Sequence, residues 1–136
     1  MFRVDIVSTP LIDSVWPTVS EGIEAACKKT GGDLTADYLW SECRAGRAFL
    51  VIVIEAGKIV AASVWEFQTW NNERVLCCLS LYGARMKEWL HLHKEFTEKM
   101  ARTGGAVAIH AHAREGWEWF FPEAEVLRKV YRMKLT

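Results

Sequence analysis

The sequence is 136 residues long, 51% hydrophobic and 12% aromatic, and it contains seven tryptophans. This length and composition exclude a disordered chain and are typical of one folded domain spanning residues 1–136. Lysine plus arginine and aspartate plus glutamate number 17 each, so the net charge of zero gives no indication of a nucleic-acid partner.

The four cysteines are Cys27, Cys43, Cys77 and Cys78, and they form no C-x-x-C pair. The adjacent Cys77 and Cys78 would point to opposite sides of a strand, which suits neither a shared metal ion nor a mutual disulfide. We therefore expect reduced thiols, a cytoplasmic protein and no bound metal. The first ten residues lack the apolar run of a signal peptide, and no stretch approaches eighteen apolar residues, so we expect no membrane association.

Charged and apolar residues alternate from Phe2 to Val7, which predicts a short strand. Asp13 or Ser14 is a suitable cap for a first helix. Pro17 fits the first turn of that helix, and Gly31-Gly32 ends it.

A second, short helix is predicted from Thr35 to about Gly46. The unbroken apolar run Phe49–Ile54 is typical of a central strand covered on both faces. A tight turn at Glu55–Lys58 joins it to a second strand, Ile59–Phe67, and the third strand is Val75–Tyr82. These three strands predict an antiparallel meander.

Apolar residues then recur at helical spacing, and these are Met86, Trp89, Leu90, His93, Phe96 and Met100. Gly104-Gly105 ends this helix, and a strand, Ala106–Ala113, follows. We predict a short aromatic helix at Glu115–Phe121 and a last, alternating strand at Val126–Leu135. The order of elements predicts an α/β (α+β) fold, with a mixed, mostly antiparallel sheet of about six strands and helices on both faces.

In element order the chain resembles the GNAT superfamily, the acetyl-CoA-dependent N-acetyltransferases. It also resembles a narrower group, small GNAT-like proteins of tailed bacteriophages. The stretches that carry this resemblance are TGGDLTADYLWSECRAGRAFLVIVIEAGKIVAA, SLYGARMKEWL, AREGWEWFFP and VYRMKL. The resemblance implies a possible acetyl-CoA cofactor and either a bacterial or phage-infected host cytoplasm or a virion as the location.

In that superfamily, the loop between the fourth strand and the third helix binds the cofactor pyrophosphate through backbone amides. Helix amino-termini attract phosphate because their N–H groups are unpaired and their dipole is positive there. The resemblance places this role on Gly83, Ala84, Arg85, Met86 and Lys87. Arg85 or Lys87 could add a charged contact. The second glycine of the family pattern is absent.

The catalytic groups are less clearly marked. The tyrosine that many members carry on the last helix is missing from Glu115–Phe121. A carboxylate base toward the amine is expected from the middle strands, where Glu66 and Glu73 are the options. His110 and His112 are two apart on a predicted strand and share a face, so they could be metal ligands, acid–base groups or structural residues. We name Glu66 and His110 as the catalytic candidates.

Other reactive side chains have plainer interpretations. His93 lies within the apolar stripe of its helix and is expected to be a hydrogen-bonded core residue, and Cys77 and Cys78 to be small buried hydrophobes. The cluster formed by Trp117, Trp119, Phe120 and Phe121 is large enough for part of it to contact a partner or ligand.

Two functions follow from these observations. One is an acyltransferase that acetylates an amine of a small molecule or protein. The other is a non-catalytic, virion-associated or partner-binding module that contacts phage structural proteins. Either could be a homodimer.

Overall fold

The computed structural model of the chain describes residues 1–113, 117 and 121–135. Its elements follow the sequence as five strands, three α-helices and one short 3₁₀ helix within these residues. They are β1 (Phe2–Ile6), η1 (Thr9–Leu11), α1 (Ile12–Lys29), α2 (Ala36–Arg44), β2 (Phe49–Glu55), β3 (Lys58–Trp70), β4 (Glu73–Gly83), α3 (Met86–Thr103) and β5 (Ala108–Ala111).

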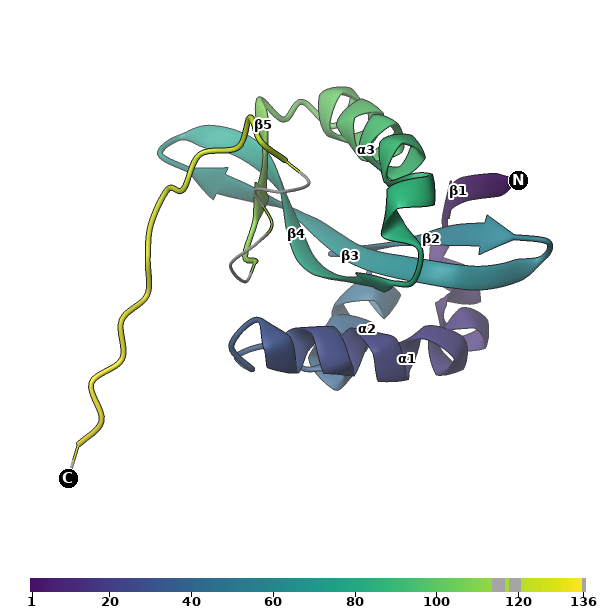
Figure 1. The fold of residues 1–136 in the computed structure, drawn as a ribbon, viewed down its shortest axis with the longest axis horizontal. Helices are drawn as coiled ribbons and strands as arrows, with labels where there is room; N and C mark the ends of the chain where they lie inside the picture. Colours follow the sequence, from purple (N-terminus) through teal and green to yellow (C-terminus); the bar gives the residue numbers. More distant parts are fainter. Residues whose placement is uncertain (114–116, 118–120, 136) are drawn as a thin grey trace.

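The strands form one sheet in the order β1-β2-β3-β4-β5. Neighbouring strands are antiparallel except β4 and β5, which are parallel because α3 crosses over between them. Helices α1 and α2 cover one face of the sheet and α3 covers the other (Figure 1). The expectation of a mixed, mostly antiparallel sheet between helices is confirmed.

The meander is held in register by two tight turns. Ala56 and Gly57 both have positive φ, as do Asn71 and Asn72. Two successive residues of positive φ are the mark of the type I′ turn, whose twist matches that of the strands it joins. Asparagine and glycine accept this conformation readily, so the turn residues fix where each strand reverses.

The apolar run of β2 is explained by its position between two cores. Leu50 and Ile52 pack against α1 and α2, while Val51 and Val53 face α3. Because both faces are covered, alternation between apolar and polar residues is lost. Trp89 of α3 is fully buried in the second core.

Helix α1 begins earlier than predicted. Its first residue is Ile12, Leu11 is the N-cap and makes no side-chain capping bond, and Pro17 lies inside the helix rather than in its first turn. The 3₁₀ helix Thr9–Leu11 runs directly into α1, so no side-chain cap is needed to start it. The predicted start of α2 is confirmed, and Thr35 is its N-cap, since Tyr38 N donates to Thr35 Oγ1 at 3.1 Å.

The prediction of a sixth strand at Val126–Leu135 is wrong. This segment has no strand pairing and runs away from the sheet as an extended chain (Figure 1). Its beginning is attached elsewhere: Lys94 Nζ lies 2.5 Å from Glu123 Oε1, and the Arg128 guanidinium lies over the Trp70 ring. The helix predicted at Glu115–Phe121 falls mostly on residues outside the described ones.

Candidate functional site

The sheet opens between β4 and β5. Pairing with β5 covers only Val75–Cys78 of β4, and no β5 residue pairs with its second half, Leu79–Gly83. At the same point β4 bulges: Ser80 pairs with Val64 and Cys78 with Trp65, so Leu79 is an extra residue. A bulge bends its strand. The second half of β4 therefore presents an edge that β5 leaves open.

The loop after this open edge is fixed by close packing. A Cβ atom on Gly83 would lie 2.4 Å from Ala61 Cβ and 2.9 Å from Trp89 Cζ2, so only glycine fits. Trp89 Nε1 donates to Ala84 O at 2.8 Å and thereby ties the loop to the first turns of α3. This tight connection from β4 to α3 places the amino-terminus of α3 beside the open edge of β4.

The backbone amides of this loop are free to bind an anion. Among the described residues, the N–H groups of Ala84, Arg85, Met86 and Lys87 make no hydrogen bond. Arg85 is the N-cap of α3 and adopts the left-handed conformation, with φ of 59°. Unpaired amides at the positive end of an 18-residue helix are suited to a phosphate group.

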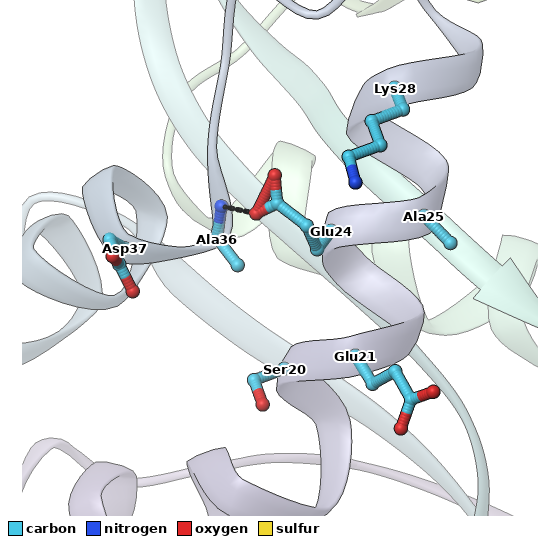
Figure 2. A pocket seen from close by; sticks show the side chains of 7 residues that line it. All are labelled: Ser20, Glu21, Glu24, Ala25, Lys28, Ala36 and Asp37. Atoms are coloured by element: carbon cyan, nitrogen blue, oxygen red, sulfur yellow. Dashed lines mark hydrogen bonds between the residues drawn. The ribbon is translucent and has the colours of Figure 1, made fainter.

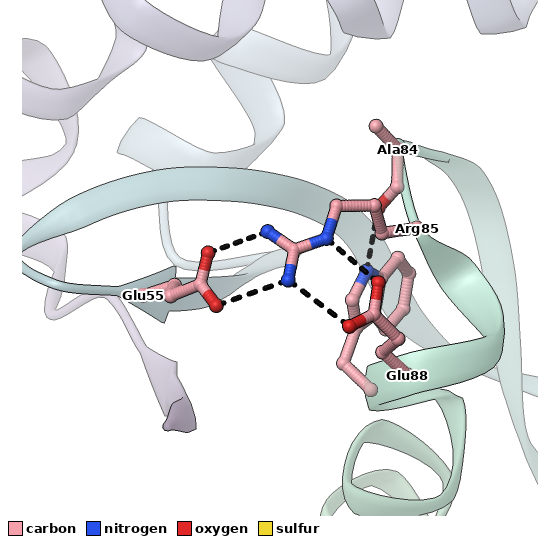
Figure 3. Close-up of polar contacts among 5 residues, drawn as sticks. Glu55, Ala84, Arg85 and Glu88 are labelled. Atoms are coloured by element: carbon pink, nitrogen blue, oxygen red, sulfur yellow. Dashed lines mark hydrogen bonds and ion pairs between the residues drawn. The ribbon is translucent and has the colours of Figure 1, made fainter.

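The Arg85 side chain, in contrast, is bound to two carboxylates (Figure 3). Its Nη1 and Nη2 atoms donate to the two oxygens of Glu55 at 2.6 and 3.2 Å, and Nε and Nη2 donate to Glu88 at 2.7 and 3.0 Å. The hydrogen bonds from Arg85 lower the pKa of Glu88. Arg85 thus already has anionic partners, whereas Lys87 forms no ion pair with any described residue.

The two catalytic candidates lie in one row across the sheet. Glu66 of β3 and His110 of β5 both pair with Cys77 of β4, one on each side. Their Cα atoms are therefore about 10 Å apart, or two strand spacings. Cys77 belongs to the core under α1 and α2, so the row lies on that face, one residue before the β4–β5 pairing ends.

A chain of polar and aromatic side chains connects the two ends of this row. Gln68 Nε2 donates to Glu66 Oε1 at 2.7 Å, and Trp70 Nε1 donates to Gln68 Oε1 at 2.9 Å. The Trp70 ring then makes edge-to-face contacts with His110 and His112, at centroid distances of 4.7 and 6.4 Å. The prediction that the two histidines share a face is confirmed.

His110 is half-buried beside the Trp70 ring. Its Nδ1 atom is buried and has no hydrogen-bond partner among the described residues. Burial, followed by the neighbouring His112, lowers the pKa of His110 below the usual 6.5. The imidazole is therefore neutral at pH 7 and has a nitrogen lone pair available.

The remaining candidates lie elsewhere. Glu73 is exposed at the start of β4, beside the β3–β4 turn. His93 is a core residue as predicted: it is 4% exposed, its Nε2 lies 2.8 Å from Ser63 Oγ, and burial lowers its pKa to about 4. Burial raises the pKa of Cys77 to about 11 and that of Cys78 to about 12, so neither thiol is a ready nucleophile.

A hollow between α1 and α2 lies apart from the loop and the row (Figure 2). Its polar lining includes Glu21, Glu24, Lys28 and Asp37. Glu24 Oε2 accepts a hydrogen bond from Ala36 N at 2.9 Å, which attaches the start of α2 to α1. Glu24 therefore has a structural role in this hollow.

Within the described part of the chain, no three histidine, cysteine or acidic side chains converge as metal ligands would. No helix in those residues has the length and apolar character to cross a bilayer.

Of the predicted aromatic cluster, Trp117 stacks on Phe121 with 5.6 Å between the ring centroids, and the other two members lie outside the described residues.

Sequence reasoning did not find the side chains that contact the candidate residues. Glu55 is 30 residues from Arg85, and no local pattern indicates that they meet. Gln68 and Trp70 could have been placed beside Glu66, because residues two apart on a strand share a face.

The fold is that of the GNAT acetyltransferases. A possible acetyltransferase from Clostridium difficile 630 superposes with a TM-score of 0.66 at 12% identity, over 100% of this chain and 99% of that one. An aminoglycoside acetyltransferase from an uncultured soil metagenomic sample gives 0.67 at 15%, over 100% and 98%. A ribosomal-protein-alanine N-acetyltransferase from Brucella melitensis biovar Abortus 2308 gives 0.69 at 10%, over 99% and 100%. No protein-family model and no curated protein matches the sequence.

Proposed function

We propose that the protein is an N-acyltransferase that binds acetyl-CoA between β4 and the start of α3 and acetylates an amine. The observation that carries this proposal is that a strand edge without a partner is continuous with a loop whose amides make no hydrogen bond. The open edge of β4, Leu79–Gly83, leads directly into the free amides of Ala84–Lys87. An extended ligand that carries amides at one end and phosphates at the other matches both.

The chain's own groups would divide the binding between them. The edge of β4 would pair with the amide groups of the pantetheine arm, as a sheet edge pairs with an added strand. The amides of Ala84–Lys87 would receive the pyrophosphate, and Lys87 would add a positive charge. Gly83 keeps the backbone close to the packed start of α3, so the amides are already oriented before a ligand arrives.

Glu66 and His110, in the row across the sheet, would act on the acceptor amine. In acyl transfer, the amine nitrogen bonds to the acyl carbon as the carbon–sulfur bond breaks, and the amine loses a proton. His110, with its lowered pKa, would accept that proton at Nε2, because Nδ1 is buried. Glu66 would attract the amine as an ammonium ion before its proton is removed. Holding amine and thioester together supplies much of the remaining rate.

A second candidate function, a non-catalytic binding module, is favoured by the state of Arg85. Glu55 and Glu88 bring two negative charges to the loop and bind the guanidinium expected to contact phosphate. A protein that no longer needs the cofactor would tolerate this arrangement. The resemblance to small phage proteins makes phage structural proteins the partners to test, in the cytoplasm or in the particle.

Calorimetric titration with acetyl-CoA, supported by a thermal-shift measurement, separates the two functions. Ligand at about 100 times its dissociation constant stabilises the native state by roughly 2.7 kcal/mol. S-acetylpantetheine, which lacks the pyrophosphate, is the matched control and is expected to bind more weakly. If millimolar acetyl-CoA gives neither heat nor a higher melting temperature, the acyltransferase proposal fails.

The acceptor can be searched for once binding is established. Release of the CoA thiol would be followed with an aminoglycoside and with a peptide that begins with alanine, the acceptor classes named for two of the structural neighbours. Glu66→Gln and His110→Gln variants serve as controls, because a rate that depends on both residues assigns the reaction to this row.

A further inference from the structure

Trp70, the last residue of β3, belongs to the chain of side chains that connects Glu66 with His110. Its indole nitrogen donates to Gln68 Oε1, and its ring contacts the imidazole rings of His110 and His112. The side chain is only partly buried. The face of an aromatic ring attracts positive charge, so a ring in this position can bind a cationic group beside the candidate catalytic residues.

A cation from the chain itself already lies on this ring. The Arg128 guanidinium carbon is 4.6 Å from the Trp70 ring centroid. Arg128 is exposed, and its side chain makes no hydrogen bond and no ion pair with any described residue. A cation–π contact at an exposed site is weak. Another cation can therefore displace this guanidinium from the ring.

A carboxylate stands beside the same ring. Glu73 pairs directly with Trp70 across the β3–β4 turn, so both side chains lie on one face of the sheet with their Cβ atoms about 5 Å apart. Glu73 is exposed and forms no ion pair within the described part of the chain. An aromatic face next to such a carboxylate binds an ammonium or guanidinium group through two attractions at once.

Glu66 provides a second carboxylate further along β3. Its Oε1 accepts a hydrogen bond from Gln68. Glu66 and Trp70 are four residues apart on the strand, which separates their Cα atoms by about 13 Å. His110 lies between them, since it is in register with Glu66 across β4 and contacts the Trp70 ring. An acceptor whose reacting amine is held by Glu66 and His110 would therefore extend toward Trp70.

We infer that Trp70 and Glu73 form a subsite for a second positive charge on the acceptor, and that Arg128 occupies this subsite while no acceptor is bound. The acceptor class is then a flexible amine that carries another ammonium or guanidinium group a short chain away, as a diamine does. The acceptor assignment rests on the proposed acyltransferase function, whereas the binding of a cation at Trp70 does not.

Cation binding is measured first, in the absence of acetyl-CoA. Putrescine is titrated into isotope-labelled protein, and the indole N–H signal of Trp70 is followed by NMR after its assignment from Trp70→Phe. Butylamine, which has the same carbon chain but a single amine, is the matched ligand control. Putrescine should bind roughly ten-fold more tightly than butylamine. Equal affinities, or no change in the Trp70 signal, overturn the inference.

Variants test the three side chains separately by calorimetry with putrescine. Arg128→Gln removes the competing guanidinium and should tighten binding a few-fold, whereas Arg132→Gln, an exposed arginine on the same segment, should change nothing. Glu73→Gln should weaken binding several-fold. Trp70→Phe keeps an aromatic face and should bind more tightly than Trp70→Leu. If Arg128→Gln lowers the melting temperature without any gain in affinity, Arg128 only anchors the segment and its role as occupant of the subsite is wrong.

Acetyl transfer to putrescine and to butylamine then tests the acceptor assignment. A preference for putrescine in kcat/KM that Glu73→Gln removes is the expected result. If acetyl-CoA and putrescine both bind and putrescine is not preferred, the acceptor assignment fails while the acyltransferase proposal stands. If acetyl-CoA does not bind, the acyltransferase proposal and the acceptor assignment both fail, and putrescine binding at Trp70 still decides whether the cation subsite exists.

Discussion

Arg85 and Glu55, thirty residues apart in sequence, meet in a two-pronged ion pair that joins the start of α3 to the end of β2. Glu88 binds the same guanidinium from the first turn of α3. The amides expected to hold pyrophosphate therefore lie near two carboxylates, Glu55 and Glu88, and two cations, Arg85 and Lys87. Any phosphate that approaches these amides must compete with Glu88 for the positive end of the helix dipole.

Neutralising Glu88 is expected to favour phosphate binding. In Glu88→Gln the helix amino-terminus loses its own anion, while Arg85 stays bound to Glu55, so acetyl-CoA should bind a few-fold more tightly in calorimetry. Glu95→Gln, on the same helix but away from the loop, is the matched control. A dissociation constant that is the same in both variants would show that Arg85 and Glu88 have no part in binding.

The pH profile of acetyl transfer is expected to reflect His110. Its pKa lies below 6.5, so the neutral form persists at mildly acidic pH and kcat/KM should fall only when the pH drops below that lowered value. In His110→Gln this acidic limb should disappear together with most of the rate, about 10²-fold or more. An unchanged limb in the variant would assign the base to another group.

Gly83→Ala is expected to be strongly destabilising. The added methyl group would meet Ala61 Cβ at 2.4 Å and the Trp89 ring at 2.9 Å, and the β3–β4 pairing leaves no room to move. Overpacking and backbone strain together should cost about 2–4 kcal/mol in the free energy of unfolding. Gly46→Ala is the control, because its φ of 78° also disfavours an L side chain but the space around it is open, and it should cost about 1 kcal/mol. Urea denaturation compares the two, and equal costs would contradict the packing argument.

The buried His93 makes stability depend on pH. Its pKa is about 4 in the folded protein and about 6.5 when unfolded, so the unfolded state binds the proton more readily. Its contribution is complete above pH 6.5 and is lost as the pH falls toward 4, a total of about 3 kcal/mol. Unfolding free energies between pH 7 and 5 exclude the contribution of Glu42 and Glu88, which have lowered pKa values and remain ionised there.

His110 acts in the same direction over that window, because its pKa is also lowered. The comparison is therefore made between the His110→Gln variant and the double variant that also carries His93→Gln. The slope of stability against pH should be smaller in the double variant. A slope that persists unchanged would mean that His93 is not the group that takes up the proton.

The sequence was informative where local chemistry decides structure. Asn71-Asn72 and Ala56-Gly57 lie at the turns, and the run of β2 is apolar because two cores meet there, so the meander could be predicted closely. The position of the loop at Gly83 followed from the order of elements. Contacts between distant segments could not be predicted: neither the pair formed by Glu55 and Arg85 nor the row from Glu66 to His110 has a local signature.

The segment Val126–Leu135 shows the limit of pattern alone. Its alternation predicts a strand, whereas the structure shows an extended chain without strand pairing, because alternation does not specify a partner strand. A strand is completed by its neighbour, and the neighbour is chosen by attachments such as the Arg128 contact with Trp70, which periodicity does not reveal.

The alignment of Glu66, Cys77 and His110 depends on the pairing of β5 with β4. His110 enters the row only while β5, four residues long and paired on one side within the described residues, stays docked against β4. Short edge strands are among the first parts of a protein to open, and they do so without global unfolding. Hydrogen exchange at Ile109 and His110 should therefore be much faster than in β2 and β3. The fraction of molecules in which His110 is aligned with Glu66 would then be set by this local opening rather than by the stability of the whole domain. A binding partner that holds β5 against β4 would raise that fraction and so act as an activator.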